Sequence, residues 1–273
     1  MTTQRAYVLS EATDEERRLH IQSAVLDPLT ARLFAAAGLA PGMRVLDLGT
    51  GAGHVAMLAA EYVGSEGEVV SVDNDPRAIA MAQGWAESER RTNITFQEGD
   101  VTSLHGIDGE FDAIVGRAIL MHLAEPEVAL RAALARLRDG GLLCLHEADF
   151  NSAWVHPETP LWSQVRRWVR GVFVAAGVDG RMGMSLFSLC RALGLPDPEL
   201  RIEAAAANGD QSPVSAWVNI VAGLLPAMEQ LGVASADEVG VHDLEQRLVA
   251  ELDEHDGFTM SPLMIGAWTH VPG

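Results

Sequence analysis

The sequence predicts an α/β protein built on a doubly wound, mostly parallel sheet, and two observations carry this prediction. Short apolar runs alternate with helical segments between residues 43 and 148, which is typical of parallel β-α units. Val45, Leu46 and Leu48 suit a strand buried on both faces, and a glycine-rich loop follows it before a helix begins near His54. Such sheets bind ligands at the carboxyl ends of their strands, so this loop is the first candidate site.

The loop carries three glycines spaced two apart, Gly49, Gly51 and Gly53. Glycine lets the chain turn sharply and lets a bulky ligand lie against bare backbone. A dinucleotide fingerprint has G-x-G-x-x-G, whereas this chain has G-x-G-x-G. Asp47 would also face a diphosphate at close range, which is electrostatically unfavourable. The loop therefore favours a ligand that carries an ammonium group.

A second strand at 68–73 ends in Asp73. Asp73 stands 24 residues after Gly49, near the spacing at which an acidic residue binds ribose hydroxyls. We favour Asp73 over Asp75 as the sugar ligand because Asp73 terminates the apolar run, while Asn74 and Asp75 are candidates for the cap of the next helix.

The remaining elements follow in the order that a seven-stranded sheet requires. A Gly140-Gly141 turn is expected between a helix and the fifth strand. The expected later strands are 94–97, 111–116, 142–146, 200–207 and 260–268, and the expected helices are 14–37, 76–89, 126–138, 161–176 and 184–193, with more helix in 213–254.

Taken in order, Asp47, the three glycines, Asp73, Asp100 and the Gly140-Gly141 turn resemble class I S-adenosylmethionine-dependent methyltransferases. The resemblance is specific over 43–148 and rests on segment order beyond it. Over its full length the chain resembles the methyltransferases of quinone biosynthesis and, more closely, their actinomycete relatives that modify secondary metabolites. The resemblance implies a Rossmann-like sheet of seven strands with an antiparallel last strand, and S-adenosyl-L-methionine as the cofactor.

The resemblance also assigns roles to residues at the strand ends. The Asp47 carboxylate would serve the amino group of the cofactor, directly or through water, and Asp73 would hold the ribose. Asp100 would bond the adenine amino group, with Val101 packed on the ring. Arg117 would position the methionine carboxylate or a substrate anion. The predicted cofactor-binding residues are Asp47, Gly49, Thr50, Gly51, Gly53, Asp73, Asn74, Gly99, Asp100, Val101, Arg117 and Tyr7.

Methyl transfer requires little catalytic machinery because the sulfonium methyl is already activated. The protein must align the acceptor in line with the methyl and, where needed, take its proton. His122, after the fourth strand, is the first candidate base, and His146, Glu147 and Asp149 follow at the end of the fifth strand. His20 is a further candidate from the N-terminal region.

The chain divides by this interpretation into an N-terminal helical lid at 1–40, a cofactor-binding core at 41–150, and 151–273, which holds the rest of the sheet with an inserted helical cap. The cap is rich in large apolar side chains that either line a substrate pocket or form ordinary core. These residues are Trp154, Trp162, Trp168, Met182, Met184, Trp217 and Met228.

Composition excludes several other classes of protein. The formal net charge is −19 over 273 residues, and all 19 basic residues are arginine. An acidic chain is a poor partner for nucleic acid, and the absence of lysine excludes Schiff-base chemistry and a phosphate-loop lysine. Cys144 and Cys190 lack the spacing of metal ligands, so we expect no metal site. Since we find neither an apolar run of membrane length nor a signal peptide in 1–9, we expect a cytoplasmic protein with no membrane partner.

Three functions remain open at this point. The first is transfer of a methyl group to an O, N or C atom of a small, largely apolar molecule. The second is a cyclisation or rearrangement by a protein with the same fold and cofactor but no net methyl transfer. The third, a nicotinamide-dependent oxidoreductase, would place a diphosphate beside Asp47. The sequence is also compatible with a homodimer through the N-terminal helix or the cap.

Overall fold

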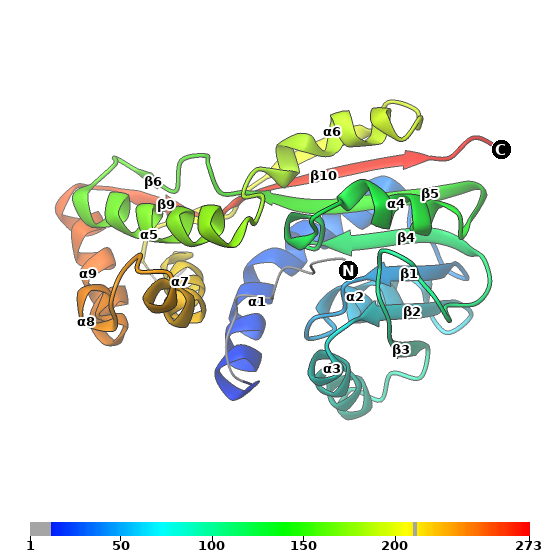
Figure 1. Ribbon diagram of the computed structural model, residues 1–273, viewed down its shortest axis with the longest axis horizontal. Helices are drawn as coiled ribbons and strands as arrows, with labels where there is room; N and C mark the ends of the chain where they lie inside the picture. Colours follow the sequence, from blue (N-terminus) through cyan, green and yellow to red (C-terminus); the bar gives the residue numbers. More distant parts are fainter. Residues whose placement is uncertain (1–11, 210–211) are drawn as a thin grey trace. The chain divides into compact units, whose positions relative to one another are not determined.

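The computed structural model describes residues 12–209 and 212–273, with side chains from residue 25 onward (Figure 1). The chain forms two compact units, each assembled from several segments. The first, which we call the sheet unit, is Asp27–Glu147, Met182–Ile202 and Met264–Gly273. The second, the helical unit, is Ala148–Arg181, Glu203–Leu263 and the described part of Met1–Leu26.

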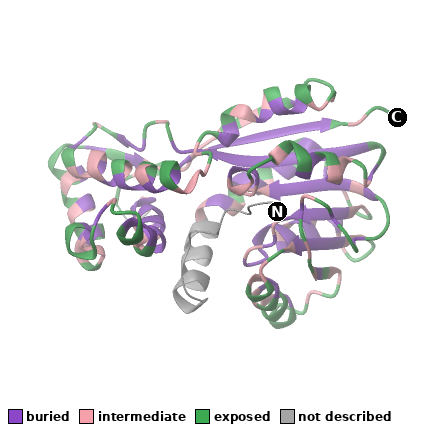
Figure 2. Cartoon of the chain, in the orientation of Figure 1, coloured by how far each residue is buried: buried purple, intermediate pink, exposed green. Residues whose placement is uncertain are grey.

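A seven-stranded sheet in the order β3-β2-β1-β4-β5-β10-β7 confirms the predicted fold class. The first five strands pair in parallel, and the last strand, β10, runs antiparallel to them (Figure 1). Figure 2 shows the central strands β1, β2, β4, β5 and β10 as largely buried, as their apolar runs predict. The strands are β1 (Arg44–Leu48), β2 (Glu68–Asp73), β3 (Ile94–Glu98), β4 (Phe111–Arg117), β5 (Leu137–Asp149), β7 (Glu199–Glu203) and β10 (Leu263–His270).

Helices cover the sheet and pack their apolar sides on it. The later half of α1, together with α2 and α3, shares one buried core with β1, β2 and β4. Gly266 of β10 allows α1 to approach closely, because a Cβ there would lie 2.4 Å from Leu33. The helices of this unit are α1 (Ala12–Ala37, whose first residues belong to the helical unit), α2 (His54–Val63), α3 (Pro76–Ser88), the 3₁₀ helix η1 (Leu120–His122), α4 (Pro126–Leu134) and α6 (Met182–Ala192).

The helical unit has a core of stacked aromatic rings. Trp154 and Trp217 stack with their ring centroids 3.8 Å apart, and Phe150 meets Phe173 edge to face at 4.9 Å. Both indole N–H groups donate to backbone carbonyls, as buried tryptophan requires. The elements of this unit are α5 (Pro160–Ala176), α7 (Val214–Gln230), α8 (Ala236–Val239), α9 (Val241–Glu254) and a small antiparallel sheet of β6 (Val155–His156), β9 (Phe258–Met260) and β8 (Ala206–Ala207).

The predicted boundaries around Gly140 are wrong, because pairing between strands overrides the local sequence pattern. The expected helix 126–138 ends at Leu134, and β5 already begins at Leu137, which pairs with Phe111. Leu137 continues the helical spacing of apolar residues, which explains the error. Gly140 and Gly141 lie inside β5 at a shift in its register, so they form an irregularity within the strand. The turn before the strand is made by Ala135 and Arg136 instead.

The last two predicted strands are each divided between the two sheets. The expected strand 200–207 becomes β7 and β8, because Ala206 pairs with Met260 of β9 in the small sheet. The expected strand 260–268 likewise starts later, as β10 at Leu263, since Met260 belongs to β9. Alternation of apolar residues indicates a strand but does not say which sheet it joins.

Candidate cofactor site

The glycine loop is bonded along its length to the end of β2. The N–H groups of Gly49 and Thr50 donate to the carbonyl of Val72 at 2.9 and 3.1 Å. The N–H of Gly51 donates to Oδ2 of Asp73 at 2.9 Å. Parallel pairing of β1 with β2 brings these two carboxyl ends together, as the sequence predicts.

Each of the three loop glycines has a positive φ, but their surroundings differ. The φ angles of Gly49, Gly51 and Gly53 are +79°, +51° and +88°. A Cβ on Gly49 would lie 2.7 Å from the side chain of Ile119, and one on Gly53 would lie 2.9 Å from that of Ala82. A Cβ on Gly51 would meet nothing within 4 Å. Gly49 and Gly53 therefore serve packing, while Gly51 presents bare backbone to open space.

Asp73 lies at the centre of this arrangement. Besides the bond from Gly51, its Oδ1 accepts the N–H of Asp75 at 3.0 Å. Asp75 is the N-cap of α3 and accepts the N–H of Arg77, so the cap role falls to Asp75, while Asn74 is exposed. Each oxygen of Asp73 keeps acceptor capacity beyond its one backbone bond. The half-buried carboxylate can therefore still accept bonds from a vicinal diol.

The end of β3 lies beside Asp73. The N–H of Gly99 donates to the Asp73 carbonyl at 2.8 Å, and a Cβ on Gly99 would approach Val72 within 3.0 Å. Asp100 is exposed, and its Oδ1 accepts bonds from the N–H and hydroxyl of Thr102. Val101 is buried. The structure thus brings Gly51, Asp73, Gly99 and Asp100 to one edge of the sheet.

Asp47 lies inside the sheet, where it pairs with β2. Its side chain is completely buried, and Oδ2 accepts the hydroxyl of Ser71 at 2.6 Å. Oδ1 has no hydrogen-bond partner among the described residues. Burial and, less strongly, Asp73 raise the pKa of Asp47 to about 7, against the opposing effects of Ser71 and Arg117. The carboxylate therefore has no solvent-exposed surface in this conformation.

Arg117 at the end of β4 is paired with α1. Its Nη1 lies 2.8 Å from Oδ1 of Asp27 and 2.9 Å from Oγ1 of Thr30. Oγ1 of Thr30 in turn lies 3.0 Å from Nδ1 of His146. Nδ1 of His54, the first residue of α2, lies 3.6 Å from Asp27. One acidic residue of α1 thus contacts both the helix that follows the glycine loop and the end of β4.

Sequence reasoning missed Asp27 and Ser71. Asp27 precedes a proline inside a helix and matches no motif. Ser71 reads as an ordinary strand residue between valines. One signal was available for Ser71, since a polar residue in an otherwise apolar buried strand needs a hydrogen-bond partner.

The three predicted catalytic residues differ in their accessibility. Glu147 is fully buried, and its Oε1 accepts the N–H groups of Ile119 and Leu120 at 2.9 and 2.8 Å. It therefore holds the start of η1. His146 is also buried, at its contact with Thr30, whereas His122 in η1 is only half-buried.

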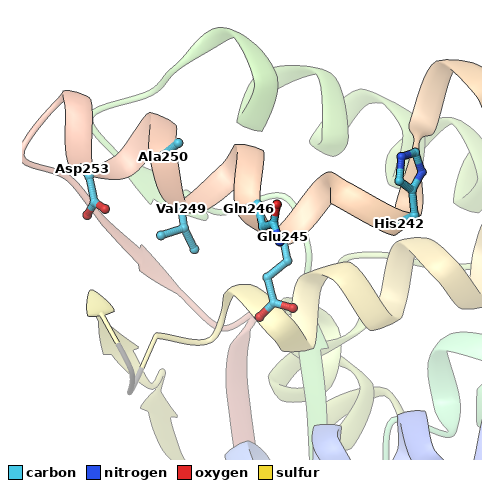
Figure 3. A pocket seen from close by; sticks show the side chains of 6 residues that line it. All are labelled: His242, Glu245, Gln246, Val249, Ala250 and Asp253. Atoms are coloured by element: carbon cyan, nitrogen blue, oxygen red, sulfur yellow. The ribbon is translucent and has the colours of Figure 1, made fainter.

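The tryptophan and methionine residues of the predicted cap differ in burial. Most of them are buried as core, and Met184 is exposed on α6. Figure 3 shows a shallow depression in the helical unit, along the outer side of α9, and none of its lining residues was predicted as a site. The lining residues are His242, Glu245, Gln246, Val249, Ala250 and Asp253.

Some predictions lie beyond what the structure describes. Tyr7 falls outside the described residues, and the side chain of His20 is not described. Among residues 12–209 and 212–273, no helix has the length and apolar character needed to cross a membrane. Within the same part of the chain, no group of three or more potential metal ligands lies together.

Comparison with known proteins matches residues 39–173 to a family described as a methyltransferase domain. The "Uncharacterized 37.1 kDa protein in transposon TN4556" of Streptomyces fradiae is 30% identical over 177 residues, covering 64% of this chain and 48% of that protein. An arsenite methyltransferase of Aquipseudomonas alcaligenes is 33% identical over 132 residues, covering 44% of this chain and 38% of that protein. The solved structure of YcgJ from Bacillus subtilis has a TM-score of 0.57 at 19% identity, covering 93% of this chain and 99% of that one, and shares the fold.

Residues 39–173 of this chain therefore match a methyltransferase domain, and these similarities support a class I S-adenosylmethionine-dependent methyltransferase. The chain spans about half the length, or less, of the curated relatives described above. The residues at the carboxyl edge fit the cofactor of this class, because Gly51 leaves open space that a Cβ would fill and Asp73 offers two acceptor oxygens beside it.

Proposed function

We propose that the protein transfers a methyl group from S-adenosyl-L-methionine to an O, N or C atom of a small molecule. One observation carries the proposal. The Asp73 carboxylate accepts the N–H of Gly51 at 2.9 Å, and the space above Gly51 is open. A sugar-binding carboxylate and a bare backbone surface are thereby held next to each other, as a nucleoside cofactor requires.

The cofactor would be held by residues from three neighbouring strand ends. Asp73 would bind the ribose hydroxyls, and Gly99 and Asp100 would face the adenine with Val101 behind them. The backbone of Gly51 would lie against the methionine part. Asp47 would favour the amino group electrostatically from inside the sheet, at pH values where its carboxylate is ionised.

When bound, the cofactor supplies an activated methyl group on a sulfonium. The chain's part is to hold the acceptor in line with that group and to exclude water. Of the three candidate bases, we assign the proton-accepting role to His122, which is only half-buried. We assign Glu147 and His146 to positioning, because both are buried and engaged with neighbouring loops or helices.

The chemistry of the chain restricts the acceptor. A net charge of −19 disfavours nucleic acid as the substrate. Arsenite, the substrate named for one relative, is a soft acceptor that binds thiolates. This chain has two cysteines, both buried, and burial raises the pKa of Cys190 to about 11 and that of Cys144 further. An acceptor that needs no thiolate ligand, such as an organic molecule, fits these properties better than arsenite does.

Two measurements test the proposal. In a thermal-shift experiment, S-adenosylhomocysteine should raise the unfolding temperature and NAD should not. With methyl-labelled cofactor and a panel of small acceptors, label should appear in a product together with S-adenosylhomocysteine. Stabilisation by NAD alone would indicate an oxidoreductase, and turnover without cofactor consumption would indicate a cyclisation or rearrangement.

A further inference from the structure

A chain of buried hydrogen bonds links the glycine loop to the interior of the sheet. Ser71 of β2 pairs with Asp47 of β1 in the strand register. Its hydroxyl donates to Oδ2 of Asp47 at 2.6 Å and forms a second hydrogen bond with Oγ1 of Thr50. Because the single hydroxyl proton of Ser71 is directed at Asp47, Thr50 is the donor in the second bond. The three side chains therefore have a defined donor order that runs from the loop to Asp47.

We propose that Ser71 is a positioning residue for the cofactor, which holds the glycine loop in its ligand-binding conformation by linking Thr50 to Asp47. This inference rests on the methyltransferase function proposed above. It assigns Ser71 no contact with the cofactor itself.

The link acts on the two groups that are proposed to face the cofactor. Thr50 immediately precedes Gly51, whose N–H is bonded to Asp73. A change in the orientation of Thr50 therefore moves the Gly51 backbone relative to Asp73. Ser71 is 0% exposed and Thr50 is 4% exposed. Bulk water thus does not reach the site to replace a missing hydroxyl.

The charges around Asp47 make the link sensitive to pH. Burial raises the pKa of Asp47 to about 7, and the charge of Asp73 on β2 adds to this effect. The Ser71 hydrogen bond and the positive charge of Arg117 on β4 oppose it. Ionised Asp47 accepts the hydrogen bond from the Ser71 hydroxyl and also favours the cofactor's ammonium. Loss of the Ser71 hydroxyl should therefore raise the pKa of Asp47 further.

Calorimetric titration with S-adenosylhomocysteine tests the link through two pairs of variants. At pH 7 we expect Thr50→Val and Ser71→Ala each to weaken binding about fivefold, the equivalent of one net hydrogen bond of about 1 kcal/mol. Thr50→Ser, which keeps the hydroxyl, should bind within about twofold of wild type. Thermal unfolding of each variant shows whether it folds. If Ser71→Ala does not fold, the comparison of Thr50→Val with Thr50→Ser tests the inference by itself.

The pH profile separates positioning from a merely structural role. For the wild type, affinity should increase as the pH rises through about 7, because binding of an ammonium favours ionised Asp47. Ser71→Ala should move this midpoint to higher pH, whereas Thr50→Val should leave it near the wild-type value. An equal loss for Ser71→Ala at every pH, or equal affinities for Thr50→Val and Thr50→Ser, would overturn the inference. Absence of binding to the wild type would instead refute the proposed function, and the inference with it.

Discussion

Arg117 and Asp27 form an ion pair between the end of β4 and α1, with Nη1 and Oδ1 2.8 Å apart. The Arg117 side chain is only 9% exposed, so its charge depends on this partner. Burial by itself would raise the pKa of Asp27, but the interactions with His54 and Arg117 outweigh burial and lower it. The arginine predicted to face the cofactor is thus already neutralised by the protein.

We expect Asp27→Ala to reduce the free energy of unfolding by about 2 kcal/mol at pH 7, because it leaves the Arg117 charge without its carboxylate. Urea unfolding measures the change. Since the folded pKa of Asp27 is lowered, its contribution is complete above the unfolded value of 3.8 and is lost as the pH falls through the folded value. The matched control is Arg77→Gln, which removes a pair whose arginine is 75% exposed and should cost less than about 0.5 kcal/mol. Equal effects of the two variants would contradict the assignment.

Asp47→Asn should be stabilising at high pH and harmful to binding. The folded pKa of Asp47 is raised to about 7, so the folded state keeps a proton that the unfolded chain releases near pH 3.8. The stability due to this group is complete below the unfolded pKa and is lost as the pH rises through 7. Between pH 4 and pH 8, the stability of the asparagine variant relative to wild type should therefore increase by about 4 kcal/mol. A difference that is flat with pH would show that Asp47 is ionised throughout this range.

Asp73→Ala tests the ribose assignment. Removal of both acceptor oxygens should weaken binding of S-adenosylhomocysteine by about tenfold, because ribose hydroxyls lose charged acceptors. The control is Asp108→Ala, at an exposed residue of the loop before β4, which should bind as the wild type does. Calorimetry measures both affinities. An unchanged affinity of Asp73→Ala would show that this carboxylate does not bind the ribose.

Gly51→Ala separates backbone strain from ligand contact. Gly51 has a φ of +51°, so alanine should cost about 1 kcal/mol of stability while finding room for its methyl group. That methyl group would occupy the space proposed for the cofactor, and binding should fall by about tenfold or more. Gly140→Ala is the matched control, because Gly140 also has a positive φ and open surroundings but lies in the irregular part of β5. If both variants bind normally, the cofactor does not lie against Gly51.

The parts of the site that could be predicted are those set by neighbours in the chain. Asp73 ends an apolar run and Gly51 lies in a loop between a strand and a helix, so parallel pairing alone brings them together. The cap at Asp75 is equally local, because it depends on residues within one turn of α3.

The parts that could not be predicted depend on packing between distant segments. Thr30 and His146 are separated by 116 positions, and Asp27 and Arg117 by 90. Glu147 is a candidate base by its place at the end of the fifth strand, and only the fold shows that it accepts two backbone N–H groups. Likewise, the division of 260–268 between β9 and β10 depends on which partner strand each residue meets.

Glu147 and His122 should respond to substitution in opposite ways. Glu147→Ala removes the acceptor for the Ile119 and Leu120 N–H groups, and we expect it to reduce the free energy of unfolding by about 2 kcal/mol. Glu147→Gln keeps an acceptor oxygen and should restore most of that loss, with activity retained. Urea unfolding and methyl-transfer assays measure the two effects.

His122→Asn should instead leave stability and binding of S-adenosylhomocysteine close to wild type, since the side chain is half-buried in a short 3₁₀ helix. If His122 accepts the acceptor's proton, kcat should fall by about 100-fold. The comparison uses the acceptor identified by the labelling assay. A kcat that falls for Glu147→Gln but not for His122→Asn would transfer the role of base to Glu147, since the amide keeps the loop contact but cannot take up a proton.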